Sequence, residues 1–134
     1  MSEENVEVVR QTVDAFNRGD ADTFVALASP EVEWEDAMFW SRVARTYRGR
    51  GELREWFNEV GETWESIHIE IEEITEAPDN SVFFGISMTA RGRGSGVETE
   101  GRAWQLIRFA DGKSVRRRVF LDRTEALEAA GLEE

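Results

Sequence analysis

Apolar side chains recur at every third or fourth position in three stretches of the first half of the chain, which is the spacing of one buried helix face. This spacing predicts a helix over residues 2–18, a short helix that Asp20 begins and Pro30 stops, and a third helix over residues 51–60 that Gly61 ends. The chain is therefore expected to begin with a layer of helices.

The hydrophobic period changes to two elsewhere, as in strands with one buried face. Residues 31–36 alternate charged and apolar side chains and predict a short strand. Residues 37–50 show no period and carry many aromatic side chains, so we expect a loop that covers part of the molecule. The later alternation predicts long strands from residue 67 to a turn at 77–80, over 82–91, over 97–109 and from a turn at 111–112 to 121, and then a helix over 125–130.

This order of elements predicts an α+β fold in a single domain, residues 1–134. A curved, mostly antiparallel sheet would wrap around the helices, with one face lining a core or cavity. The outer face would carry Phe83, Trp104 and Leu106. Such an apolar patch favours a homodimer through the outer sheet face, and a docking surface for a different protein is the alternative.

The charged residues and the absence of cysteine narrow the possible partners and chemistry. The chain has 28 acidic and 16 basic residues, a net charge of −12, which repels the phosphates of nucleic acid and an anionic membrane surface. Cysteine is absent and His68 is the only histidine, so we expect no metal and no cofactor. The first residues lack the basic start and apolar run of a secretory signal, so we expect a cytoplasmic protein.

Five motifs spread over nearly the whole chain carry a resemblance to a known family. They are FNRGD (16–20), VEWED (32–36), YRGRG (47–51), RFADGK (108–113) and LDRTEALEAAGL (121–132). Together they resemble the SnoaL-like branch of the nuclear transport factor 2-like superfamily. The resemblance implies a cone-like fold in which a curved sheet and N-terminal helices enclose a pocket. It implies no single activity, since the superfamily includes isomerases, cyclases, epoxide hydrolases, dehydratases and transport adaptors.

Asp36 is the residue to which the resemblance gives a chemical role. Ketosteroid isomerase, a member of the superfamily, places its general-base Asp at the end of the first strand, and Asp36 falls at that position. Burial beside Trp34 and the aromatic loop would make the carboxylate a better base, able to remove a proton next to a carbonyl or to activate water. The alternative is that Asp36 only caps the turn into the loop.

The other family patterns are incomplete in this chain. Thr12 and Gln105 stand where the isomerase has the Tyr and the protonated Asp that hold the enolate, and they are only ordinary hydrogen-bond donors. The expected inward positions of the late strands, Gln105, Arg117 and Val119, include no carboxylate or histidine like that of the polyketide cyclases. Residues 91–93 lack the interleaved Asp of the epoxide hydrolases. The resemblance therefore implies the fold rather than one reaction.

Arg117 is the second residue of chemical interest. In the run Arg116-Arg117-Arg118 the middle side chain must face opposite to its neighbours, so Arg117 faces the pocket if the other two face outward. There it would pair with Asp36 and hold it ionised, or bind a carboxylate or enolate of a ligand. The alternative is a partly solvated charge at the rim, bridged to one of the many acids.

The expected pocket is mostly apolar with four polar points. The apolar positions are Trp34, Phe39, Trp40, Tyr47, Met88 and Ile107, and the polar ones are Thr12, Asp36, Gln105 and Arg117. Such a pocket suits a flat, hydrophobic small molecule with a carbonyl or hydroxyl group.

Two hypotheses on function follow. The first is a small-molecule-binding protein with isomerase, cyclase or hydrolyase chemistry in which Asp36 is the base. The second is a non-catalytic ligand-binding or interaction module of the same fold, in which Asp36 and Arg117 neutralise each other.

Overall fold

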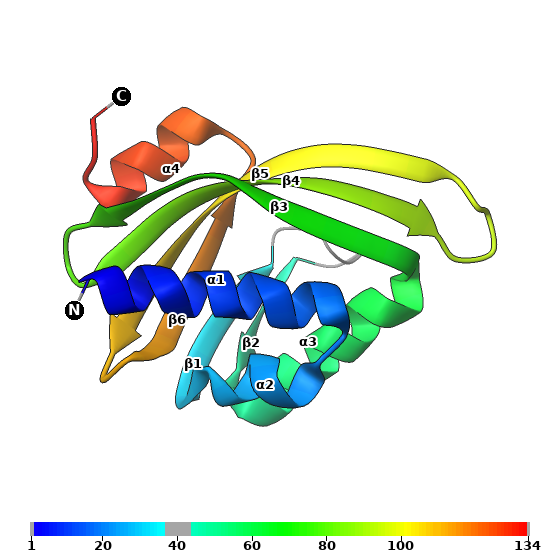
Figure 1. Ribbon diagram of the computed structural model, residues 1–134, viewed down its shortest axis with the longest axis horizontal. Helices are drawn as coiled ribbons and strands as arrows, with labels where there is room; N and C mark the ends of the chain where they lie inside the picture. The colour runs from blue at the N-terminus through cyan, green and yellow to red at the C-terminus, as the bar shows by residue number, and fades with distance from the viewer. Residues whose placement is uncertain (1, 37–43, 134) are drawn as a thin grey trace.

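A six-stranded sheet curves around three helices, and a fourth helix lies on the other side of the sheet (Figure 1). The computed structural model describes residues 2–36 and 44–133 of the 134-residue chain. Its elements are α1 (Ser2–Arg18), α2 (Ala21–Ala26), β1 (Ala28–Asp36), β2 (Arg45–Arg48), α3 (Gly49–Thr63), β3 (Trp64–Ala77), β4 (Ser81–Gly92), β5 (Glu98–Ala110), β6 (Lys113–Phe120) and α4 (Arg123–Ala130). The strand order is β2-β1-β6-β5-β4-β3, with β1 and β6 parallel and the other pairs antiparallel. The α+β fold class expected from the sequence is confirmed.

The second helix is shorter than its apolar pattern suggested. It ends at Ala26, β1 begins at Ala28, and Pro30 therefore lies in a strand. The register between β1 and β6 is interrupted between Ala28 and Glu33. This irregularity accommodates a proline, which has no N–H to donate to the neighbouring strand.

The segment expected to be a loop contains regular structure in its described part. Residues 45–48 form β2 on the edge of β1, and α3 begins at Gly49 and continues past Gly61 to Thr63. The buried Trp56 and Val60 hold the helix against the sheet, so packing outweighs the low helix propensity of Gly61.

Aromatic side chains form the centre of the core between the helices and the sheet. Phe24 lies between the rings of Trp34, Trp56 and Phe57, with centroid separations of 5.4, 5.8 and 5.0 Å. Phe16 contacts the same group from α1. Contacts of this kind each add about 1 kcal/mol beyond the apolar area that they bury. The rings fix the relative positions of α1, α2, α3 and β1.

Asparagine side chains connect α1 to the sheet at both ends of the helix. Near its end, Asn17 donates to the carbonyl of Ile69 and accepts from the N–H of the same residue, each over 2.9 Å. Near its start, Asn5 donates to Asn80 Oδ1 over 2.8 Å, and Asn80 donates to the carbonyl of Phe109. The middle of α1 contacts the sheet through apolar side chains, which makes it the wall of the cavity described below.

The outer face of the sheet differs from the expected exposed patch. Phe83 and Leu106 are buried beneath Ala126, Leu127 and Ala130 of α4. The prediction that they are available to a partner is therefore wrong, because a C-terminal helix of the same chain covers them. Figure 1 shows this helix above β3 and β4, on the side opposite to α1. Trp104, the third predicted interface residue, is only half-buried.

Candidate functional site

The alternation of β1 places Asp36 inside the fold. Trp34 and Asp36 are buried, whereas Glu33 is exposed. The Asp36 carboxylate, 2% exposed, accepts a hydrogen bond from Trp56 Nε1 to Oδ2 over 3.1 Å. Asp36 therefore faces the interior and is attached to α3.

Arg117 lies on the same side of the sheet, as the run of three arginines indicated. It is 1% exposed, so the alternative of a solvated charge at the rim is wrong. Its Nε donates to Gln105 Oε1 over 2.8 Å, and a terminal nitrogen donates to the carbonyl oxygen of Glu35. The guanidinium carbon lies 4.7 Å from the centre of the Trp34 ring and 5.5 Å from that of Trp56. Hydrogen bonds and cation–π contacts hold this cation in one position.

The two buried charges compensate each other in part. Burial lowers the pKa of Arg117 to about 10, while the negative charges of Asp36 and Glu35 act in the opposite direction. Arg117 therefore remains a cation at neutral pH. The charge of Asp36 thus acts on Arg117, and pairing with Asp36 was one of the two roles considered for this arginine.

A small cavity lies between the middle of α1 and the concave face of the sheet, with a volume of about 20 Å³. Five predicted site residues line it, namely Thr12, Trp34, Gln105, Ile107 and Arg117. This volume is enough for one water molecule and is far below the several hundred Å³ of a typical ligand site.

Several side chains that line this cavity carry hydrogen-bond donors. Trp34 Nε1 is buried and has no hydrogen-bond partner among the described residues. Gln105 turns its oxygen to Arg117, which leaves its amide nitrogen as the group that can donate. Thr12 differs from the expected donor, because its hydroxyl donates to the carbonyl of Val8 over 2.7 Å within α1. The cavity wall therefore suits a ligand that accepts hydrogen bonds.

Several predicted pocket residues lie elsewhere. Tyr47 is buried but does not line the cavity, and its hydroxyl donates to Glu59 Oε2 over 2.6 Å. Met88 packs in the core, and Asp36, which accepts from the Trp56 indole, is not among the residues that line this cavity. Phe39 and Trp40 fall outside the described residues.

The other lining residues belong to the apolar faces of helices and strands. Their helical or strand period showed burial but could not show that a cavity lies beside them. They are Val9, Val13, Phe16, Phe24, Trp56, Ile69 and Phe84.

Two other kinds of site can be assessed in the described part of the chain. No three His, Cys, Asp or Glu side chains there lie close enough together to hold a metal ion. None of the helices over residues 2–36 and 44–133 is both long and apolar enough to span a membrane. The buried charges and the cavity mark the side chains around Arg117 as the candidate site.

Solved structures share this architecture at low sequence identity. Bal32a, from a soil-derived mobile gene cassette, is 24% identical with a TM-score of 0.79, over 96% of this chain and 97% of that protein. A Catenulispora acidiphila protein with a ketosteroid isomerase-like fold, in complex with trimethylamine, is 16% identical with a TM-score of 0.77, over 95% and 94%. The epoxide hydrolase/cyclase-like enzyme SalBIII, of pyran ring formation in the polyether salinomycin, is 22% identical with a TM-score of 0.76, over 91% and 93%. These similarities show a common fold.

The family assignment comes from the sequence match itself. A search of curated proteins found no match. The family model of the SnoaL-like domain matches residues 9–117, a range that runs from the cavity-lining Val9 to the buried Arg117. The chain therefore belongs to the SnoaL-like domain family, as its motifs indicated.

Proposed function

We propose that this protein binds a small, mainly apolar molecule bearing an oxygen acceptor in the cavity between α1 and the sheet. The observation that carries the proposal is the indole of Trp34, which lines the cavity and whose buried N–H has no partner among the described residues. A buried donor without an acceptor destabilises a fold by about 1–3 kcal/mol. An oxygen atom in the cavity, from water or from a ligand, removes this penalty.

The charges around the cavity specify the kind of ligand oxygen. Arg117 and the amide nitrogen of Gln105 provide positive potential on the same wall as Trp34, whereas Asp36 does not line the cavity. A carbonyl or hydroxyl oxygen is favoured there, and the aromatic walls favour an apolar body.

The volume of the cavity determines how such a ligand enters. Since about 20 Å³ holds one water molecule, a larger ligand displaces that water and pushes lining side chains aside. The side chains of Val9, Val13 and Phe16 are the part of the wall that α1 contributes. They are apolar, and the polar attachments of α1 are at Asn5 and Asn17. The middle of the helix can therefore adjust while both ends stay attached.

A catalytic role of Asp36 is the second candidate, in an isomerase, cyclase or hydrolyase acting on a hydrophobic carbonyl or hydroxyl compound. It is favoured by the deep burial of Asp36 and by the Arg117 cation, which would stabilise negative charge developing on a substrate oxygen. The similarity to the cyclase-like enzyme SalBIII is in keeping with this class of reaction. In the non-catalytic alternative, Asp36 only neutralises Arg117.

The binding proposal can be tested by titrating flat carbonyl compounds into the protein and measuring heat and thermal stabilisation. Trp34→Phe removes the cavity N–H and keeps a ring, so we expect its affinity to fall about 10-fold. Trp104→Phe is the matched control, because the Trp104 indole donates to Glu73 on the outer face. Equal affinity in both variants would contradict the proposal. Asp36→Asn then separates catalysis from binding, since it should abolish turnover and retain binding only if Asp36 is the base.

A homodimer through the outer sheet face is also proposed, with Trp104 rather than Phe83 or Leu106 at its centre. The half-buried Trp104 is the apolar side chain of the predicted patch that α4 leaves partly uncovered. Sedimentation should show a dimer that Trp104→Glu dissociates. A monomer would favour a different protein as the partner of this face.

A further inference from the structure

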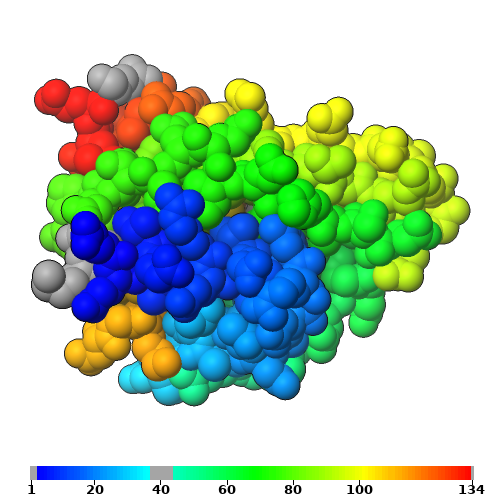
Figure 2. Space-filling view, viewed as in Figure 1, coloured from blue at the N-terminus to red at the C-terminus, as the bar shows by residue number. Residues whose placement is uncertain are grey.

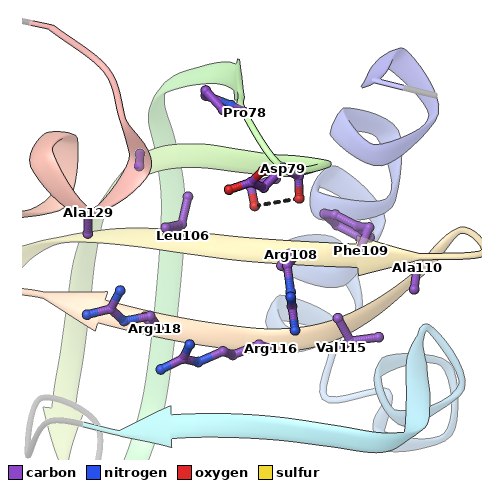
Figure 3. A pocket seen from close by; sticks show the side chains of 12 residues that line it. Pro78, Asp79, Leu106, Arg108, Phe109, Ala110, Val115, Arg116, Arg118 and Ala129 are labelled. Carbon is purple, nitrogen blue, oxygen red and sulfur yellow. Dashed lines mark hydrogen bonds between the residues drawn. The ribbon is translucent and has the colours of Figure 1, made fainter.

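A second hollow lies on the opposite side of the sheet from the cavity, beside α4. Its volume is about 690 Å³, within the range of small-molecule sites, and it borders the turn between β3 and β4. Figure 3 shows Arg108 on β5 and Arg116 and Arg118 on β6 along its wall, with Leu106 and Phe109 nearby. In the part of the chain that the structure describes, it is a much larger space than the cavity at Arg117.

The three arginines are neighbours in the sheet. Arg108 and Arg116 are direct cross-strand partners, and Arg118 is the next outward-facing position on β6. Like charges in such positions repel and destabilise a sheet. No acidic side chain within the described ranges comes within ion-pair distance of these three, whereas Arg102 and Arg123 have glutamate partners on the same face. In a chain with a net charge of −12, three adjacent cations without an acid are a specific local feature.

The acids near the hollow do not neutralise it. Glu33 is next to Arg116 in the register of β1 and β6, and Asp79 lines the hollow, yet neither forms an ion pair with an arginine there. Within the described part of one chain, the arginines at the wall therefore have no ion-pair partner.

Arg118 provides an independent indication of a ligand. Its guanidinium carbon lies 5.0 Å from the centre of the Phe120 ring, which holds the side chain in place. Its Nε is buried and has no hydrogen-bond acceptor among the described residues. An oxyanion bound at Arg118 would satisfy this donor once the guanidinium turns toward it.

We propose that the hollow binds an organic carboxylate with a short apolar body. The guanidinium groups of Arg108, Arg116 and Arg118 receive the carboxylate, because their planar N–H pairs match its two oxygens. Pro78, Val115 of β6 and Ala129 of α4 line the hollow, are not buried, and provide apolar surface for the body of the ligand. The site is separate from the cavity around Trp34, so the two proposals can fail independently.

The test is calorimetric titration with octanoate, octanol, acetate and inorganic phosphate. We expect octanoate to bind. Octanol lacks the charge, and acetate and phosphate lack the apolar contact, so these three compounds should bind more weakly than octanoate. Arg116→Gln and Arg108→Gln, both at exposed positions, should each lower the affinity for octanoate about 10-fold or more. Arg10→Gln on α1 makes the same change in net charge away from the hollow and should bind like the natural chain. Trp34→Phe should also leave octanoate affinity unchanged.

Three results would overturn the proposal. Equal binding of acetate, phosphate and octanoate would mean general attraction of anions. Loss of octanoate binding in Trp34→Phe but not in Arg116→Gln would place the carboxylate in the inner cavity. Absence of octanoate binding, together with a change in sedimentation of Arg116→Gln, would assign the arginines to an interface between copies of the chain.

Discussion

The indole nitrogen of Trp56 donates to Asp36 Oδ2 over 3.1 Å, which attaches the last residue of β1 to the middle of α3. This bond holds a carboxylate inside the fold, close enough to the buried Arg117 for the two charges to interact. The site therefore depends on a balance of charge as well as on hydrogen bonds.

Removing the Asp36 charge should destabilise the protein. Asp36→Asn keeps an oxygen for the Trp56 indole but leaves the buried Arg117 cation without this compensation. We expect the free energy of unfolding to fall by about 3 kcal/mol, as measured by urea denaturation. The double variant, Asp36→Asn with Arg117→Met, should lose less free energy of unfolding than the two single variants lose together. Additive losses would show that the two charges do not interact.

Arg117 should make the stability of the protein depend on pH in alkaline solution. Its pKa of about 10 in the folded protein is below that of an unfolded arginine, so the unfolded chain binds more protons at higher pH. The stability of the natural chain relative to Arg117→Met should therefore rise between about pH 9 and pH 11. Lys113 is the only lysine and Tyr47 the only tyrosine, which keeps other titrations few. A stability difference that is constant over this range would contradict the assignment.

Gly85 should be required for the position of Trp104 on the outer face. A Cβ atom at Gly85 would lie 2.9 Å from Trp104 Cδ1 and 3.1 Å from Glu73 Cγ. Gly85→Ala should therefore displace the indole from Glu73, with a loss of about 1–3 kcal/mol and a shift of tryptophan fluorescence. An unchanged emission spectrum in Gly85→Ala, with Trp104→Phe used to identify the contribution of that ring, would argue against this packing.

Gly61 should tolerate alanine, because it lies inside α3. It is exposed, and a Cβ atom there would meet no other atom within 4 Å. Gly61→Ala should raise the free energy of unfolding by about 0.5–1 kcal/mol. A loss of stability would instead support the sequence-based prediction that the helix ends at this glycine.

The strands from β3 to β6 and the inward position of Arg117 could be predicted because both depend on local alternation of side chains. The run Arg116-Arg117-Arg118 is informative since a strand must separate its middle member from the other two. Residues 45–48 gave no such signal, because they form a four-residue edge strand without an apolar period. The burial of Phe83 and Leu106 was missed because it depends on where the distant α4 packs. The size of the cavity depends on how side chains from several elements meet, which a period does not report.

Ligand binding at the Trp34 indole is tested most directly by the proton–nitrogen NMR spectrum of the five tryptophan indole groups. The Trp34 and Trp104 signals are assigned with Trp34→Phe and Trp104→Phe. The proposal predicts that a carbonyl ligand found by titration shifts the Trp34 signal and slows its exchange with deuterium, while the Trp104 signal stays in place. A ligand that binds and leaves the Trp34 signal unchanged would contradict it.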